Sequence, residues 1–267
     1  MTFRWPTCSK WGRFPTCPPY RAATAGSGTP SWMFSRASAF LLALPLLAST
    51  VTGKVELRDS REASVRKRLD YSGVVISLVQ LLKPAARLSD AHVTMRQKNK
   101  TFSPHILAVA AGTFVDFPND DPIFHNAFSS YSGEIFDVGL YAPGTSRSVQ
   151  FSRAGIVRVF CNIHSSMSAV IVVLPTPYFI TTGRDGTFQI PNVPPGEYQM
   201  SVFHERATEA TLSALSRRIT VEPASLALST IVISEAGFLQ MPHNNKYGRA
   251  YPPETNDNSI YPASKKE

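Results

Sequence analysis

The sequence has few cysteines, and their placement is uneven. Only three occur among 267 residues: Cys8 and Cys17 lie within the first fifty residues, and Cys161 is the only one after them. If the N-terminal segment is removed on export, the mature chain has no second cysteine with which to form an intramolecular disulfide. A lone thiol in an exported protein requires another explanation, and metal ligation is one.

Three other observations each argue against a class of protein. No long stretch shows helical periodicity, so a helical bundle is not expected. No glycine-rich loop follows an expected strand, which argues against a nucleotide-dependent enzyme. Acidic residues are absent from 1–50, so most of the formal charge of +8 lies there and the remainder carries only +3. With no basic stripe interleaved with aromatics, we expect no nucleic-acid partner.

The N-terminal region has the pattern of a secretory signal peptide. Arg36 precedes an apolar run at 39–48, and the small residues Ala48-Ser49-Thr50 follow it. A run of about ten apolar residues is too short to span a membrane. We therefore expect residues 1–50 to be an extension plus a signal peptide, with Met33 as the true start, cleavage near residues 48–53, and a periplasmic or otherwise exported product. A signal with a long charged region and an uncleaved anchor are the alternatives.

Short apolar or alternating runs separated by Gly, Pro, Asn and Asp predict an all-β protein. The expected strands are 51–57, 73–79, 92–95, 106–110, 114–117, 149–151, 156–160, 169–174, 178–181, 187–190, 199–204, 216–221 and 226–234. Pro175-Thr176-Pro177 interrupts the pattern, which predicts one β-sandwich at 51–175 and a smaller one at 176–235. The polar, proline-rich segment 236–267 is expected to be disordered.

Four residues provide donor atoms that suit copper. Cys161, His164 and Met167 have the spacing C-x2-H-x2-M on an expected loop between two strands, and His125 lies upstream. A thiolate, two imidazoles and a weak thioether form the ligand set of a blue-copper electron-transfer site, because thiolate and thioether suit Cu(I) and imidazole suits both oxidation states. Zinc could use the same ligands, but the thioether favours copper. The other four histidines are expected at the surface or in turns.

These residues resemble the cupredoxin family, especially its amicyanin and plastocyanin members. The family shows a V-x-F-x-N segment, then H-N, then C-x2-H followed by Met. This sequence has them at 115–119, at His125-Asn126 and at 161–167. The resemblance implies a Greek-key β-sandwich with one type 1 copper ion. His125, Cys161 and His164 would be equatorial ligands and Met167 axial, and Asn126 would tether the ligand loop. Ile163 departs from the pattern, because many relatives have proline there.

The mature chain, over roughly residues 51–235, resembles bacterial cupredoxins of the methylamine utilization protein type. The pattern from Asp185 to Tyr198 resembles carboxypeptidase-regulatory-like, transthyretin-related modules, which implies a small β-sandwich after the cupredoxin. We therefore expect a non-enzymatic carrier of single electrons between redox partner proteins, with His164 as the exit point. Copper storage or delivery, or an interaction module with a degenerate site, is the alternative, since a simple electron shuttle needs no second domain.

Overall fold

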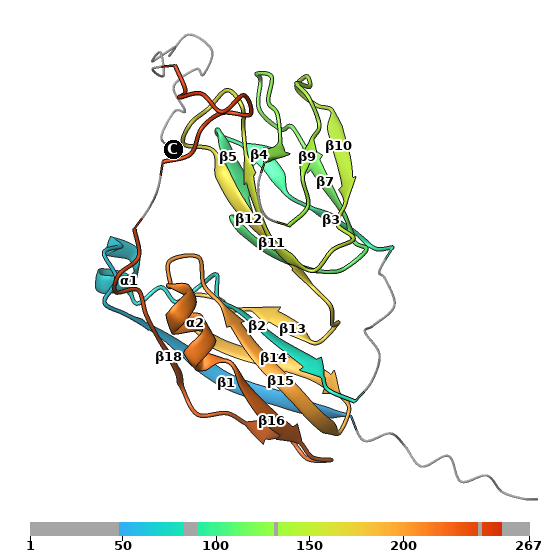
Figure 1. Cartoon of the computed structure of the whole chain (residues 1–267), viewed down its shortest axis with the longest axis vertical. Helices are drawn as coiled ribbons and strands as arrows, with labels where there is room; N and C mark the ends of the chain where they lie inside the picture. Colours follow the sequence, from blue (N-terminus) through green and yellow to red (C-terminus); the bar gives the residue numbers. More distant parts are fainter. Residues whose placement is uncertain (1–47, 83–89, 131–132, 240–241, 253–267) are drawn as a thin grey trace, which may run out of the picture. The chain divides into compact units, whose positions relative to one another are not determined.

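The computed structural model describes residues 48–82, 90–130, 133–239 and 242–252 (Figure 1). Regular structure in these ranges is β except for two short helices, so the all-β prediction is confirmed. No helix among these residues is long and apolar enough to cross a membrane. The expected signal peptide lies almost wholly outside the described ranges, and its export function stays a prediction.

One β-sandwich, which we name the flanking sandwich, is built from residues 49–80 and 179–234, which lie on either side of the other sandwich in the sequence. One of its sheets has the order β14-β1-β17, with β18 also pairing with β1, and the other has the order β13-β2-β15-β16. The elements are β1 (Ser49–Arg58), α1 (Ala63–Arg68), β2 (Val75–Gln80), β13 (Phe179–Thr181), β14 (Thr187–Val193), β15 (Gly196–Phe203), α2 (Glu209–Leu215), β16 (Arg217–Val221), β17 (Leu226–Ala227) and β18 (Ile231–Ser234).

The second β-sandwich, the inserted sandwich, is formed by the residues between β2 and β13. Its sheets have the orders β10-β7-β3 and β6-β12-β11-β8-β9, and β4 and β5 form a separate hairpin. The elements are β3 (His92–Thr94), β4 (Arg96–Lys98), β5 (Thr101–Ser103), β6 (Ile106–Ala110), β7 (Phe114–Pro118), β8 (Phe128–Ser129), β9 (Phe136–Asp137), β10 (Ser146–Gln150), β11 (Gly155–Phe160) and β12 (Ser168–Leu174).

This arrangement changes the expected division at residues 51–175 and 176–235. β1 pairs antiparallel with β14 and parallel with β17 and β18, and β2 pairs with β13 and β15. Alternate residues of β1, including Val51 and Val55, are fully buried in the same core as Ile231 and Ile233. The first expected strands therefore belong to the second expected sandwich, because their apolar faces are buried against residues that come much later in the chain.

Strand β12 explains how the inserted sandwich holds its ligand loop. All of its central residues, 169–173, are buried. Ala169, Ile171 and Val173 face the core of the inserted sandwich. Val170 and Val172 lie on the opposite face, in a separate cluster that also contains Val75 of β2. A strand that is covered on both faces has a continuously apolar sequence, as β12 does. The ligand loop is thus attached to a strand that is packed from both sides.

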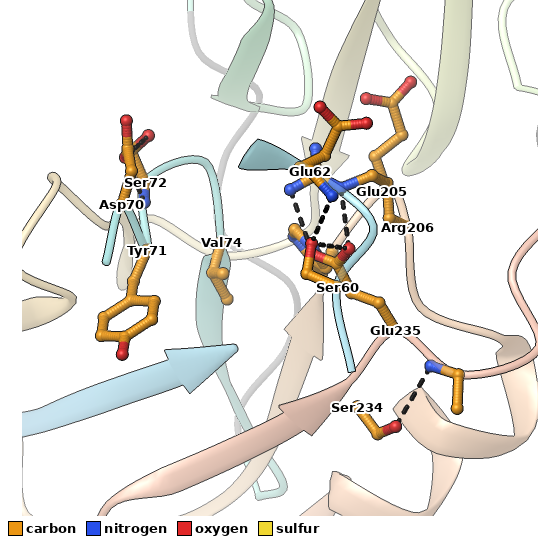
Figure 2. Close-up of polar contacts among 12 residues, drawn as sticks. Ser60, Glu62, Asp70, Tyr71, Ser72, Val74, Glu205, Arg206, Ser234 and Glu235 are labelled. Carbon is orange, nitrogen blue, oxygen red and sulfur yellow. Dashed lines mark hydrogen bonds and ion pairs between the residues drawn. The ribbon is translucent and has the colours of Figure 1, made fainter. Parts of the chain in front are cut away.

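A buried carboxylate joins three strand ends of the flanking sandwich. Figure 2 shows Glu235, which follows β18, accepting hydrogen bonds from Ser60 at 2.6 Å and from Arg206 at 3.0 and 3.1 Å. The Nε2 of His204 lies 2.9 Å from Oε1 of the same carboxylate. His204 is only 3% exposed, unlike the surface or turn position expected for it. These contacts close the end of the sandwich where β1, β15 and β18 terminate.

Candidate metal centre

The predicted ligand loop connects two paired strands of the inserted sandwich. Phe160 pairs with Ser168 at the end of the antiparallel β11–β12 ladder, so residues 161–167 form the turn beyond it. The Cys161 N–H donates to the carbonyl of Met167 at 3.1 Å, and the Met167 N–H donates to the carbonyl of His164 at 3.2 Å. The loop is therefore closed by its own backbone, with Cys161 and Met167 at its base.

The fold brings His125 to this loop from a distant part of the chain. His125 lies beyond β7, and its backbone exchanges two hydrogen bonds with Tyr141, at 3.2 and 2.9 Å. Its Nδ1 is 3.8 Å from the Sγ of Cys161, and the Nδ1 of His164 is 3.6 Å from the same sulfur. One ligand atom from each of the three residues lies within 4.8 Å of the others. Three of the four predicted ligands thus converge.

The fourth predicted ligand, Met167, lies in the same apolar core as Cys161, and both are 0% exposed. His125 is also fully buried, whereas His164 is partly exposed and its neighbour Ile163 is 41% exposed. Of the four predicted ligands, His164 is therefore the one that reaches the surface. The axial role of Met167 stays a prediction.

The protonation state of His125 suits a metal ligand. Its Nε2 lies 2.7 Å from the carboxylate of Asp121, which is 3% exposed. Burial lowers the pKa of His125 by more than the nearby carboxylate raises it, so the ring is neutral near pH 7. A neutral ring that donates from Nε2 leaves the lone pair of Nδ1 directed toward Cys161.

The side chain of Asn126 is hydrogen-bonded to the ligand loop, as the resemblance implied. The Asn162 N–H donates to the side-chain oxygen of Asn126 at 3.3 Å. The amide nitrogen of Asn126 donates in turn to Asp137 at 2.7 Å and to the carbonyl of Gly139 at 2.9 Å. Asn126 is fully buried, and its three hydrogen bonds connect the loop to Asp137 of the neighbouring strand β9 and to Gly139.

The C-terminal segment 242–252, which the composition led us to expect to be disordered, contacts the ligand loop. The Tyr251 hydroxyl donates to the carbonyl of Cys161 at 2.8 Å, and the Lys246 N–H donates to the side chain of Asn162 at 3.0 Å. The ring of His243 stacks on Phe160 with centroids 4.0 Å apart. Burial, together with the nearby Cys161, raises the pKa of Tyr251 to about 12, so its hydroxyl remains a donor.

The expectation of disorder was therefore wrong for this segment, because its aromatic rings and amide groups find partners on the inserted sandwich. We name residues 242–252 the strap. The remainder of the expected tail, 253–267, lies outside the described ranges.

Comparisons with known proteins give a partial likeness. The chain matches no protein-family model and no curated protein. Part of it is similar to a purple cupredoxin from Nitrosopumilus maritimus, at 24% identity over 32% of this chain and 100% of that chain, with a TM-score of 0.28. It is similar to an oxidised amicyanin variant at 18% identity over 37% of this chain and 98% of that one, with a TM-score of 0.30.

A copper-containing nitrite reductase from Thermus scotoductus SA-01 is similar at 24% identity, with a TM-score of 0.31. That likeness covers 36% of this chain and 25% of the reductase. Each of these three likenesses is confined to about a third of this chain.

Sequence reasoning missed two contributors to the centre, Asp121 and Tyr251. Asp121 lies four residues before His125, and an acidic residue so close to a candidate ligand is a usable signal for a carboxylate that orients an imidazole. Tyr251 gave no such signal, because it lies ninety residues from Cys161 in a segment without strand periodicity.

Proposed function

We propose that the protein binds one copper ion through His125, Cys161 and His164, with Met167 as a weak axial ligand, and carries single electrons between redox partner proteins. One observation carries the proposal: the Sγ of Cys161 lies 3.8 Å and 3.6 Å from the Nδ1 atoms of two histidines in a largely buried site. A thiolate between two imidazoles selects copper among the common metals when a thioether completes the set.

The residues present fit such an ion chemically. The neutral His125 ring directs a lone pair toward the cysteine sulfur, and Cys161 is held by its own backbone and by the Tyr251 hydroxyl. Copper, when bound, supplies reversible one-electron exchange between Cu(II) and Cu(I). Four protein ligands leave no coordination position for a substrate, which favours a carrier over an enzyme.

The protein itself would exclude water from the copper site and hold the ligand side chains in fixed positions. His125, Cys161 and Met167 are fully buried, and the ligand loop is bonded to Asn126 on one side and to the strap on the other. A ligand cage that is already fixed rearranges little when the charge at its centre changes, which is the requirement for rapid outer-sphere transfer. The partly exposed His164 is the proposed exit for the electron.

The redox partners and the compartment complete the proposal. The signal-like pattern at 33–50 supports export to the periplasm, where an electron carrier would meet partner proteins by diffusion. Export also leaves Cys161 as the only cysteine of the mature chain, so the ligand thiol has no competing disulfide partner.

The test is a visible spectrum of the metal-free protein titrated with Cu(II). We expect an intense thiolate-to-copper charge-transfer band that saturates at one equivalent and disappears reversibly on reduction. Cys161→Ser abolishes the band, whereas His92→Gln, which alters an exposed histidine on β3, leaves it unchanged. A wild-type protein that stays colourless and retains no copper would refute the proposal.

A further inference from the structure

Asp121 contacts His125 on the side of the ring opposite the cysteine. The Asp121 Oδ2 lies 2.7 Å from the Nε2 of His125, while the Nδ1 of the same ring lies 3.8 Å from the Sγ of Cys161. The side chains of Asp121 and His125 are 2% and 0% exposed. The imidazole therefore lies between a buried carboxylate and the proposed metal position, with one nitrogen directed at each.

A tight hairpin fixes the position of this carboxylate. Strands β4 and β5 are joined by Asn99 and Lys100, whose φ angles of 54° and 55° are both positive, as in a two-residue hairpin turn of type I′. The N–H groups of these residues both point at Asp121, at 2.6 Å to Oδ1 and 2.9 Å to Oδ2. Two backbone donors stabilise the ionised carboxylate and cannot be removed by side-chain motion.

The backbone of Asp121 is fixed as well. Its N–H donates to the side-chain oxygen of Asn119 at 3.1 Å, and the amide nitrogen of Asn119 donates to the carbonyl of Ile123 at 2.8 Å. Asn119 is fully buried. The turn that carries Asp121 thus has both its main chain and its carboxylate tied to neighbouring elements, and the hydrogen bond to His125 is an oriented one.

We propose that Asp121 is a positioning residue that fixes His125 as the Nε2–H tautomer and, in the proposed copper site, favours Cu(II) over Cu(I). The proposal rests on the copper site proposed above. An ionised carboxylate that accepts the Nε2 proton makes Nδ1 a stronger electron donor, and it places a negative charge near the ion. Both effects stabilise the more highly charged oxidation state, and so Asp121 lowers the reduction potential.

Asp121→Asn tests this role, because it removes the charge with little change in shape. Loss of such a carboxylate typically weakens metal affinity by about 10- to 100-fold. We expect that loss for Cu(II) and little change for Cu(I), which raises the reduction potential by about 60 to 120 mV at about 59 mV per tenfold. Asp120→Asn is the matched control, because that carboxylate lies one residue away and binds Arg96 at 2.7 Å. We expect it to leave both quantities unchanged.

A measurement on the metal-free wild-type protein tests the same role without any variant. The ¹⁵N chemical shifts of the His125 ring should report the Nε2–H tautomer, and the Nδ1–H tautomer would overturn the proposal even if Asp121→Asn did not fold. A folded Asp121→Asn protein with wild-type Cu(II) affinity and reduction potential would overturn it as well. A colourless wild-type protein would refute the copper site itself, while the tautomer measurement would still decide the role of Asp121.

Discussion

Replacing Glu235 by glutamine is expected to destabilise the flanking sandwich by removing a buried charge from its closed end. Glu235 is 6% exposed, and its carboxylate contacts Ser60, His204 and both nitrogens of the Arg206 fork. Glutamine keeps the size of the side chain. It loses the negative charge to which Arg206 is paired, and one of its two terminal atoms becomes a donor that faces other donors.

The magnitude follows from the pKa of the carboxyl group. Burial raises the pKa of Glu235, but the hydrogen bonds from His204, Arg206 and Ser60 outweigh this and lower it from 4.5 to about 2. Each unit corresponds to about 1.36 kcal/mol, so the ionised carboxylate stabilises the fold by about 3 kcal/mol. Breaking a buried ion pair typically costs about 3–5 kcal/mol, which agrees with this value.

The sign of the pH dependence is fixed by the direction of the shift. Because the folded pKa lies below the unfolded one, the stabilisation is complete above the unfolded pKa of 4.5 and is lost as the pH falls toward 2. The difference in free energy of unfolding between wild type and Glu235→Gln should be about 3 kcal/mol at pH 7. At pH 3 it should be less than half of that.

Urea unfolding at pH 7, 5, 4 and 3, followed by circular dichroism, measures this difference. Glu197→Gln, which changes an exposed glutamate on β15, is the control and should differ from wild type by less than about 0.5 kcal/mol. A Glu235→Gln protein as stable as wild type at pH 7 would refute the reasoning. So would a difference that stays constant between pH 5 and pH 3.

Three further predictions concern the metal centre and the N-terminus. Met167→Leu should keep the visible copper band and raise the reduction potential, because a weak axial ligand is lost, whereas Met200→Leu in the flanking sandwich should not. An unchanged potential would remove Met167 from the ligand set. Tyr251→Phe should lower the free energy of unfolding by about 1 kcal/mol, because one hydrogen bond is lost. Tyr247→Phe is the control, because Tyr247 is 69% exposed, and it should leave the free energy of unfolding unchanged. Equal effects of the two variants in urea unfolding would contradict this prediction. Mass spectrometry of the exported protein should find Ser49 as the first residue, because Ser49 is buried and begins β1. A chain that begins after Val51 would contradict the role of β1.

Strand positions could be predicted from the sequence because burial leaves a local signature. The runs expected at 106–110, 156–160 and 169–174 correspond closely to β6, β11 and β12. The pairing of those strands could not be predicted, because a hydrogen-bonded partner far along the chain leaves no periodic trace. The expected division between residues 175 and 176 therefore assigned β1 and β2 to the wrong sandwich.

The candidate site could be predicted from the sequence for those residues whose side chains are distinctive metal donors. Cys161, His164 and His125 are rare residues with characteristic spacing, and the structure brings their ligand atoms together. The β4–β5 hairpin was missed because its turn is Asn99-Lys100, in place of the Asn-Gly pair that usually indicates a two-residue turn. The hairpin also acts on a distant part of the chain, because the N–H groups of its turn bind a carboxylate about twenty residues later.

The insertion of one sandwich within the other determines the order in which the chain can fold during synthesis. Strands β1 and β2 are made first, but their partners β13 to β18 begin only at Phe179. At about 5–20 residues per second, the ribosome needs roughly 5 to 20 s to make the residues between them. During that interval every residue of the inserted sandwich appears, including all four proposed copper ligands. All four proposed copper ligands are therefore synthesised while the strands that precede them still have no partners.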